Sequence, residues 1–74
     1  LEKQMKKFGV KPGDQVVNMK GVVANKDLYY LGEGITAEVK TNTVHIREYG
    51  LGSGDVESVT LSKKQFDMLK KLSR

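Results

Sequence analysis

The sequence predicts a mainly β fold (β+α): a small antiparallel, partly open barrel of about five short strands, with a C-terminal helix packed on it. Two alternating segments and one amphipathic segment lead to this prediction. Residues 35–39 and 43–48 alternate apolar and polar side chains with a period of two, which indicates neighbouring half-buried strands. Near the C-terminal end, Phe66, Leu69 and Leu72 recur at the spacing of one helix face.

The first segment, residues 1–11, is predicted to form a basic arm or a short helical turn. Leu1, Met5 and Phe8 have the spacing of one helix face, and Gly9 follows as a stop. A helix of this length is too short to be stable by itself. We therefore expect the segment to depend on the rest of the domain for its structure.

The middle segment, residues 12–62, is predicted to form the barrel. After a Pro-Gly-Asp turn, residues 15–24 read as a strand with a bulge or bend at Gly21, and residues 28–31 read as a second short strand. The stretch from Val10 to Val23, with Gly-Asp-x-Val before one strand and Gly-x-Val at the start of the return, resembles the opening of many small SH3-like barrels. It is similar to the ribosomal and transcription-factor motif that binds RNA or protein through such a barrel. The resemblance covers 14 of the 74 positions and implies a barrel without naming a ligand.

The hairpin prediction also specifies a register. A two-residue connection at 41–42 would pair apolar with apolar side chains on one face and acidic with basic or polar side chains on the other, and a slip by one residue would destroy both matches. The predicted pairs are Val39 with Val44, Ala37 with Ile46, Glu38 with His45 and Thr36 with Arg47.

The C-terminal part is predicted to be a strand followed by a helix. Residues 49–55 contain three glycines and read as a flexible loop, and residues 56–61 read as the next strand. Ser62 and Gln65 fit a capping box, which starts an amphipathic helix over residues 63–74. We expect this helix to bury its apolar side on the sheet, and its loss to unfold the domain.

Composition excludes several classes of function. A chain of 74 residues is one domain, near the lower size limit for independent folding. It contains no Cys and a single His, which excludes disulfides, thiolate sites and multi-His metal sites. No apolar run approaches the roughly 20 residues that cross a bilayer, and no secretory signal is visible. We expect a cytoplasmic protein with no membrane partner, metal or cofactor.

Catalysis is not expected. His45 lies mid-strand beside Glu38, an arrangement that is common in surface cross-strand pairs. Asp55 and Glu57 share a strand face, but nothing brings carboxylates together in a pocket, and so small a domain has little room for one. The glycines at 50, 52 and 54 precede a strand rather than the helix that phosphate-binding loops require. The sequence therefore predicts no enzyme and no small-molecule substrate.

Charge divides the chain into blocks. Residues 1–11 hold four lysines and one acid, residues 12–62 hold four basic and seven acidic residues, and residues 63–74 hold five basic residues and one acid. Basic ends indicate contact with a polyanion, although the same lysines would also suit a solvated helix side and a frayed tail. The predicted nucleic-acid-binding residues are Lys3, Lys6, Lys7, Lys11, Lys63, Lys64, Lys70, Lys71 and Arg74.

The leading functional hypothesis is therefore a DNA- or RNA-binding domain that uses its basic termini while aromatic rings stack on bases. The alternative is a protein–protein interaction or regulatory module, such as a small mobile-element or phage-type factor or a fragment of a larger chain, that self-associates or binds another protein. Tyr29, Tyr30 and Tyr49 are the aromatic residues of the predicted interaction patch.

Overall fold

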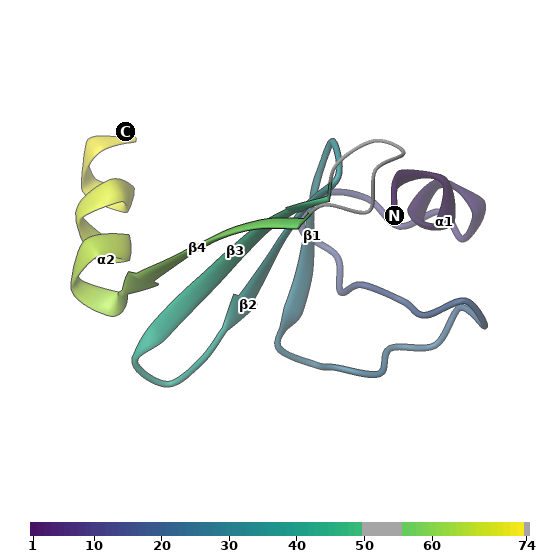
Figure 1. The fold of residues 1–74 in the computed structure, drawn as a ribbon, viewed down its shortest axis with the longest axis horizontal. Helices are drawn as coiled ribbons and strands as arrows, with labels where there is room; N and C mark the ends of the chain where they lie inside the picture. Colours follow the sequence, from purple (N-terminus) through teal and green to yellow (C-terminus); the bar gives the residue numbers. More distant parts are fainter. Residues whose placement is uncertain (50–55, 74) are drawn as a thin grey trace.

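The computed structural model describes residues 1–49 and 56–73, which form an open four-stranded antiparallel sheet with a helix at each end (Figure 1). Of the predicted glycine loop at 49–55, Tyr49 is instead the last residue of a strand, and residues 50–55 lie outside the described residues, as does Arg74. In chain order the elements are α1 (Glu2–Lys7), β1 (Leu28–Gly32), β2 (Ile35–Val39), β3 (Thr43–Tyr49), β4 (Val56–Ser62) and α2 (Lys63–Leu72).

The β+α class is confirmed, but the SH3-like barrel and its five strands are not. The strand order is β1-β2-β3-β4, so β1 and β4 occupy the two edges of an open sheet. The predicted strand at 15–24 contributes one isolated bridge, between Gln15 and Tyr29. The chain then turns at Asn18, whose side-chain oxygen accepts hydrogen bonds from the backbone N–H groups of Lys20 and Val22. A local asparagine turn thus outweighs the strand preference of the flanking valines.

The predicted hairpin is confirmed in every pair. Val39 lies opposite Val44, Ala37 opposite Ile46, Glu38 opposite His45 and Thr36 opposite Arg47. The register continues without a shift into β4, where Leu61 pairs with Val44 and Val59 pairs with Ile46. One sheet face is therefore apolar through β2, β3 and β4, and the other carries polar side chains.

Helix α1 is held by tertiary contacts, as its short length requires. Met5 is fully buried, the Gln4 side chain donates to the carbonyl of Val17 at 2.8 Å, and the Glu2 carboxylate accepts from the backbone N–H of Gly34 at 2.9 Å. Gly9 follows with a φ of 69°, a left-handed conformation that suits glycine after a helix end. The predicted helical turn in the basic arm is thus anchored to the end of the sheet where β1 and β2 are connected.

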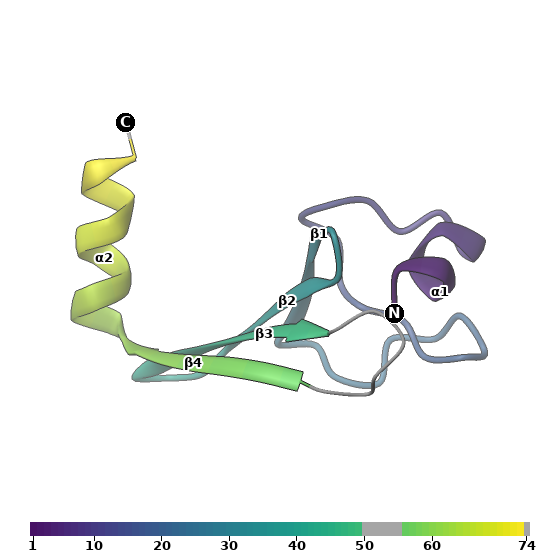
Figure 2. The ribbon, with the colours of Figure 1, turned by 45° about the horizontal axis from the view of Figure 1, so that its top comes forward.

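Helix α2 forms with the predicted capping box, because the Ser62 hydroxyl accepts from the Gln65 backbone and the Gln65 side chain accepts from Ser62 N–H. The expectation that it packs on the sheet is wrong. It contains no buried residue, and Leu72 is 73% exposed. Figure 2 shows α2 projecting away from the end of β4. The physical reason is the junction: β4 ends at Ser62 and α2 begins at Lys63, so no connecting residues allow the helix to fold back.

Few of the described side chains are buried. The buried apolar residues are Met5, Tyr30, Ala37 and Val44, and they lie on α1 and the first three strands. The radius of gyration is 12.9 Å, against about 11 Å for a compact domain of this length. The molecule is accordingly elongated, with extents of 34 × 25 × 23 Å. Its stability depends on a small core at the α1 end and in the sheet.

Candidate nucleic-acid interface

The N-terminal basic residues form a cluster on and just after α1. Lys3, Lys6, Lys7 and Lys11 are all exposed, whereas Glu2, the acid of this segment, is bound to the backbone of Gly34. The short helix presents these lysines because its other side is anchored by Met5. We call this set of four lysines the α1 cluster.

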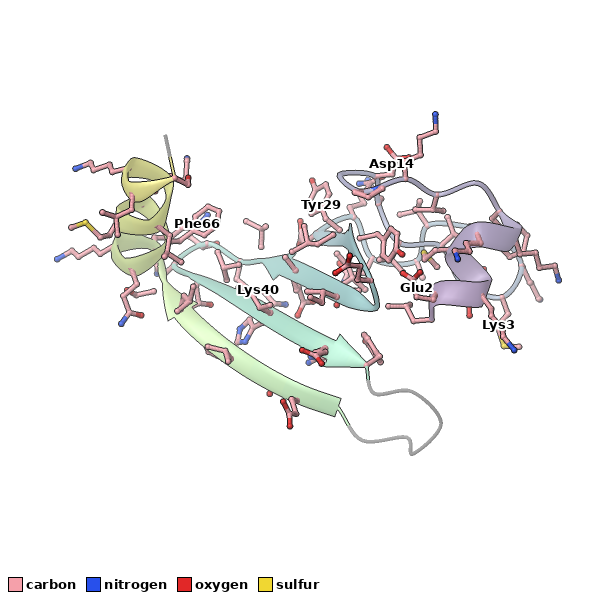
Figure 3. The ribbon with its side chains drawn as sticks, turned by 90° about the horizontal axis from the view of Figure 1, so that it is seen from above. Glu2, Lys3, Asp14, Tyr29, Lys40 and Phe66 are labelled. Atoms are coloured by element: carbon pink, nitrogen blue, oxygen red, sulfur yellow. The ribbon has the colours of Figure 1, made fainter. Side chains whose placement is uncertain are left out.

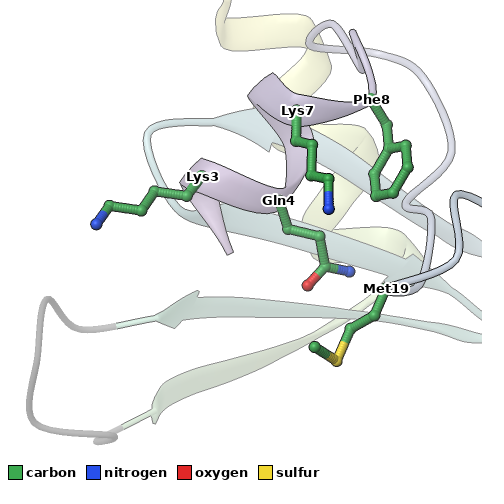
Figure 4. A pocket seen from close by; sticks show the side chains of 5 residues that line it. All are labelled: Lys3, Gln4, Lys7, Phe8 and Met19. Atoms are coloured by element: carbon green, nitrogen blue, oxygen red, sulfur yellow. The ribbon is translucent and has the colours of Figure 1, made fainter.

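A shallow hollow of about 170 Å³ lies beside the α1 cluster. Figure 4 shows its lining: Gln4 extends from the helix toward Met19 and Lys7 lies beside Phe8, whereas Lys3 extends outward on the other side. Lys7 Nζ lies 5.4 Å from the centre of the Phe8 ring, within the range of a cation–π contact. The hollow is smaller than the roughly 300 Å³ at which ligand pockets begin. It therefore suits one flat ring or one phosphate at the surface better than an enclosed ligand.

The C-terminal basic residues lie along α2. Lys64, Lys70 and Lys71 are exposed, and Lys63 is half-buried at the first turn. Lys70 Nζ lies 5.6 Å from the ring centre of Phe66, one turn earlier. Arg74, the last predicted residue of this group, lies outside the described residues. We call Lys63, Lys64, Lys70 and Lys71 the α2 cluster.

None of these eight lysines is neutralised within the described part of the chain. Across residues 1–49 and 56–73 the ion pair present is that of Lys40 with Glu38, at 3.4 Å. Asp67 lies in α2 near four lysines in sequence, yet it has no ion pair with them. The two clusters thus present positive charge that is not paired with an acidic side chain among residues 1–49 and 56–73.

The two clusters do not form one continuous patch. In Figure 1, α1 and α2 occupy opposite ends of the sheet, along the longest dimension of 34 Å. The whole molecule is thus about as long as one turn of B-form DNA, roughly 34–36 Å. A single nucleic acid that touches both clusters must therefore cross the whole length of the domain.

The predicted aromatic patch is reduced by the structure. Tyr30 is buried, with 4% of its surface exposed, and is unavailable for stacking or for partner contact. Tyr29 and Tyr49 are half-buried, and Figure 3 shows Tyr29 beside the segment that contains Asp14. Phe8, at 36% exposed, is the aromatic ring closest to free lysines. Stacking on a base would therefore involve Phe8 before any tyrosine.

The polar face predicted for the hairpin continues onto β4, and this continuation was not predicted from the sequence. Arg47 on β3 and Ser58 on β4 are cross-strand partners, as are His45 and Thr60, and Arg47, Ser58 and Thr60 are exposed. Arginine and hydroxyl side chains are common donors to phosphate oxygens. Extending the predicted hairpin register by one strand would have placed these residues together.

Glu38 and His45 are cross-strand partners, but each has other hydrogen bonds. The Glu38 carboxylate accepts from the Asn25 side chain at 2.7 Å and lies near Lys40, while His45 Nδ1 lies 2.9 Å from the Thr60 hydroxyl. The hydrogen bond from Asn25 is the largest cause that lowers the pKa of Glu38 below its ordinary value. Burial opposes it, and the hydrogen bond and charge of Lys40 add smaller lowering effects. This acid is thus held in its charged form by neutral and basic neighbours.

Comparison with protein-family models, curated proteins and solved structures gives no match for this chain. Neither of the helices that the structure describes has the length and apolar character needed to span a bilayer. The described residues also contain no group of three acidic or histidine side chains placed to hold a metal ion.

Proposed function

We propose that this chain is a small non-catalytic nucleic-acid-binding domain that contacts phosphates with the α1 and α2 clusters. The observation that carries the proposal is the set of eight lysines that lack an ion-pair partner within the described residues, gathered at two ends of one molecule. Phosphate contacts of this kind release counterions and supply most of the affinity in sequence-independent binding. We expect the domain to act in the cytoplasm.

The α1 cluster is expected to contribute more to binding than the α2 cluster. There the lysines stand beside Phe8 and the surface hollow, so that one segment offers both cations and an aromatic ring. A ring beside cations suits an unpaired base with its phosphate. The α2 cluster offers cations next to Phe66, which is half-buried. Single-stranded DNA or RNA is therefore the expected ligand, and duplex DNA is the comparison.

Fluorescence anisotropy with labelled single-stranded DNA, duplex DNA and RNA tests the proposal. Affinity for single strands should fall as salt rises from about 50 mM to about 200 mM. Each phosphate contact should steepen the slope of log affinity against log salt concentration by about 0.7. Replacing Lys3, Lys6 and Lys7 with glutamine should flatten that slope by about 2. Absence of binding to all three probes at about 50 mM salt would refute nucleic-acid binding.

A control variant tests whether the position of the lysines matters beyond net charge. Lys20→Gln with Lys26→Gln removes two exposed lysines that belong to neither cluster. For each charge removed, this variant should weaken binding less than the triple variant of α1, and less than Lys64, Lys70 and Lys71 replaced together by glutamine. An equal loss of affinity per charge removed in all three variants would mean that net charge, and not the two clusters, governs binding.

A second candidate function is a protein-interaction module, and the exposed apolar side of α2 favours it. Met68, Leu69 and Leu72 are each at least half exposed. An amphipathic helix with its apolar side in solvent is typical of a segment that a partner covers. If no nucleic acid binds in the titration above, this candidate becomes the leading function.

A further inference from the structure

The two edges of the sheet differ in how their backbone groups are satisfied. Along β1, the outer edge is covered by the preceding segment: Gly13 N–H donates to Tyr30 O at 2.7 Å, Tyr30 N–H to Asp14 O at 2.8 Å and Val16 N–H to Leu28 O at 3.0 Å. A register shift between Tyr30 and Gly32 further interrupts this edge. Both are ways in which proteins prevent an edge strand from pairing with another chain.

The β4 edge has no such cover within the described residues. Its residues 57–60 are all exposed, its register with β3 is uninterrupted, and its seven residues contain one charge, Glu57, and no proline or lysine. In Figure 3, β4 forms the outer strand, and α2 leaves from its end in a direction away from that edge. A long, regular and nearly uncharged edge is a template for strand addition.

The backbone groups that point outward can be identified. Lys63 N–H donates to Asn42 O at 3.0 Å, directly after β4. Because backbone hydrogen bonds alternate in direction along an antiparallel strand, residues 57, 59 and 61 also face β3. The N–H and C=O groups of Ser58 and Thr60 therefore point away from the sheet, toward the open edge.

Surface area indicates how large a partner the chain needs. The chain exposes 5768 Å², whereas a compact monomer of its mass is expected to expose about 4500 Å². The excess of about 1200 Å² is comparable to the roughly 800 Å² that each partner buries in a standard interface. A symmetric dimer with a standard interface would thus bury about two thirds of this excess.

We propose that a second copy of this chain pairs with β4, antiparallel and about a two-fold axis at Val59, to give a continuous eight-stranded sheet. In this register Ser58 of each copy exchanges hydrogen bonds with Thr60 of the other, which uses the outward groups of both. The two Val59 side chains, each 58% exposed in the monomer, meet as a close non-hydrogen-bonded pair. Glu57 lies opposite Leu61 of the other copy, so that the two acids are not opposed. The contact is isologous, as a closed dimer requires.

Sedimentation velocity and NMR on the protein without nucleic acid test the proposal, so its outcome is independent of the proposed function. The wild-type chain should sediment as a dimer. Thr60→Pro removes one outward N–H that the monomer does not use, and proline is tolerated on an edge at such a position. This variant should sediment as a monomer while its NMR spectrum keeps the dispersion of a folded sheet. Thr60→Val, which retains the N–H, should remain dimeric.

A monomeric wild-type chain would overturn the proposal, and so would a folded Thr60→Pro variant that stays dimeric. A dimer that survives Thr60→Pro but dissociates when Leu69 and Leu72 are both replaced by glutamate would place the contact on α2 and overturn the strand pairing. If Thr60→Pro fails to fold, disulfide formation decides: Val59→Cys should form a cross-linked dimer under mild oxidation. Failure of Val59→Cys to cross-link then contradicts the two-fold axis at that residue.

Discussion

The buried hydroxyl of Thr36 provides a quantitative test of how the core is built. Thr36 is the second residue of β2 and is fully buried, yet its Oγ1 has no hydrogen-bond partner among the described residues. A buried polar group without a partner costs about 1–3 kcal/mol. Valine has nearly the same shape and a strong preference for strands, so it would remove this cost and leave no cavity.

We therefore expect Thr36→Val to raise the free energy of unfolding by about 1 kcal/mol or more. For a domain of this size, each kcal/mol corresponds to about 4–8 °C in Tm. Circular dichroism during heating and urea titration measures both quantities. The matched control is Thr60→Val. Unlike that of Thr36, the Thr60 side chain is exposed, and its Oγ1 already has a partner, His45 Nδ1 at 2.9 Å. The control should stay within about 0.5 kcal/mol of wild type.

A Thr36→Val variant that is less stable than wild type would refute the reasoning. It would mean that the hydroxyl has a partner, such as a bound water or a group of a second chain, and that valine leaves that partner unsatisfied. A stabilised Thr60→Val control would equally weaken it, since the gain would then come from strand preference rather than from relief of a buried polar group.

Three further predictions concern α1, the acid in β2 and α2. Met5→Ala removes a fully buried side chain that anchors α1 and should cost about 2–5 kcal/mol in urea titration; a loss under 1 kcal/mol, about the size of a surface change, would show that α1 is not part of the core. Because the pKa of Glu38 is below its ordinary value of 4.5, its charged form stabilises the fold. This contribution is complete above pH 4.5 and is lost as the pH falls through the lower pKa of the folded state. The stability difference between wild type and Glu38→Gln should shrink in acid, and a constant difference at all pH values would contradict this. Removing residues 68–74 takes away no buried side chain of α2, so the shortened chain should still melt cooperatively; a broad, non-cooperative melt would show that the helix is packed in solution.

Local pattern was sufficient to predict the β2–β3 hairpin and the start of α2. The register followed from residues on both faces at once, since Val39 with Val44 and Glu38 with His45 agree with the same alignment. The capping box at Ser62 and Gln65 followed from a three-residue spacing. Such features are decided by neighbours in sequence or across one tight turn, and these are visible in the sequence.

Features that depend on distant segments were not predictable in this way. Hydrophobic spacing showed which side of α2 is apolar, but it could not show that a direct junction with β4 keeps that side off the sheet. The valines after Gln15 suggested a strand, while the Asn18 turn limits the segment to covering the β1 edge. The basic termini were visible as lysines, but their separation to opposite ends needed the fold (Figure 1).

The most direct test of the proposed function is a two-dimensional NMR titration of the isotope-labelled chain with single-stranded DNA at low salt. The proposal predicts that backbone amide signals shift at the α1 cluster, including Phe8, and along α2 at Lys70 and Lys71, and that the shifts reverse when salt is added. The assignment of the two ends as the nucleic-acid interface would be contradicted if no amide signal shifts. It would also be contradicted if the signals shift only at residues remote from both clusters and the shifts persist at high salt.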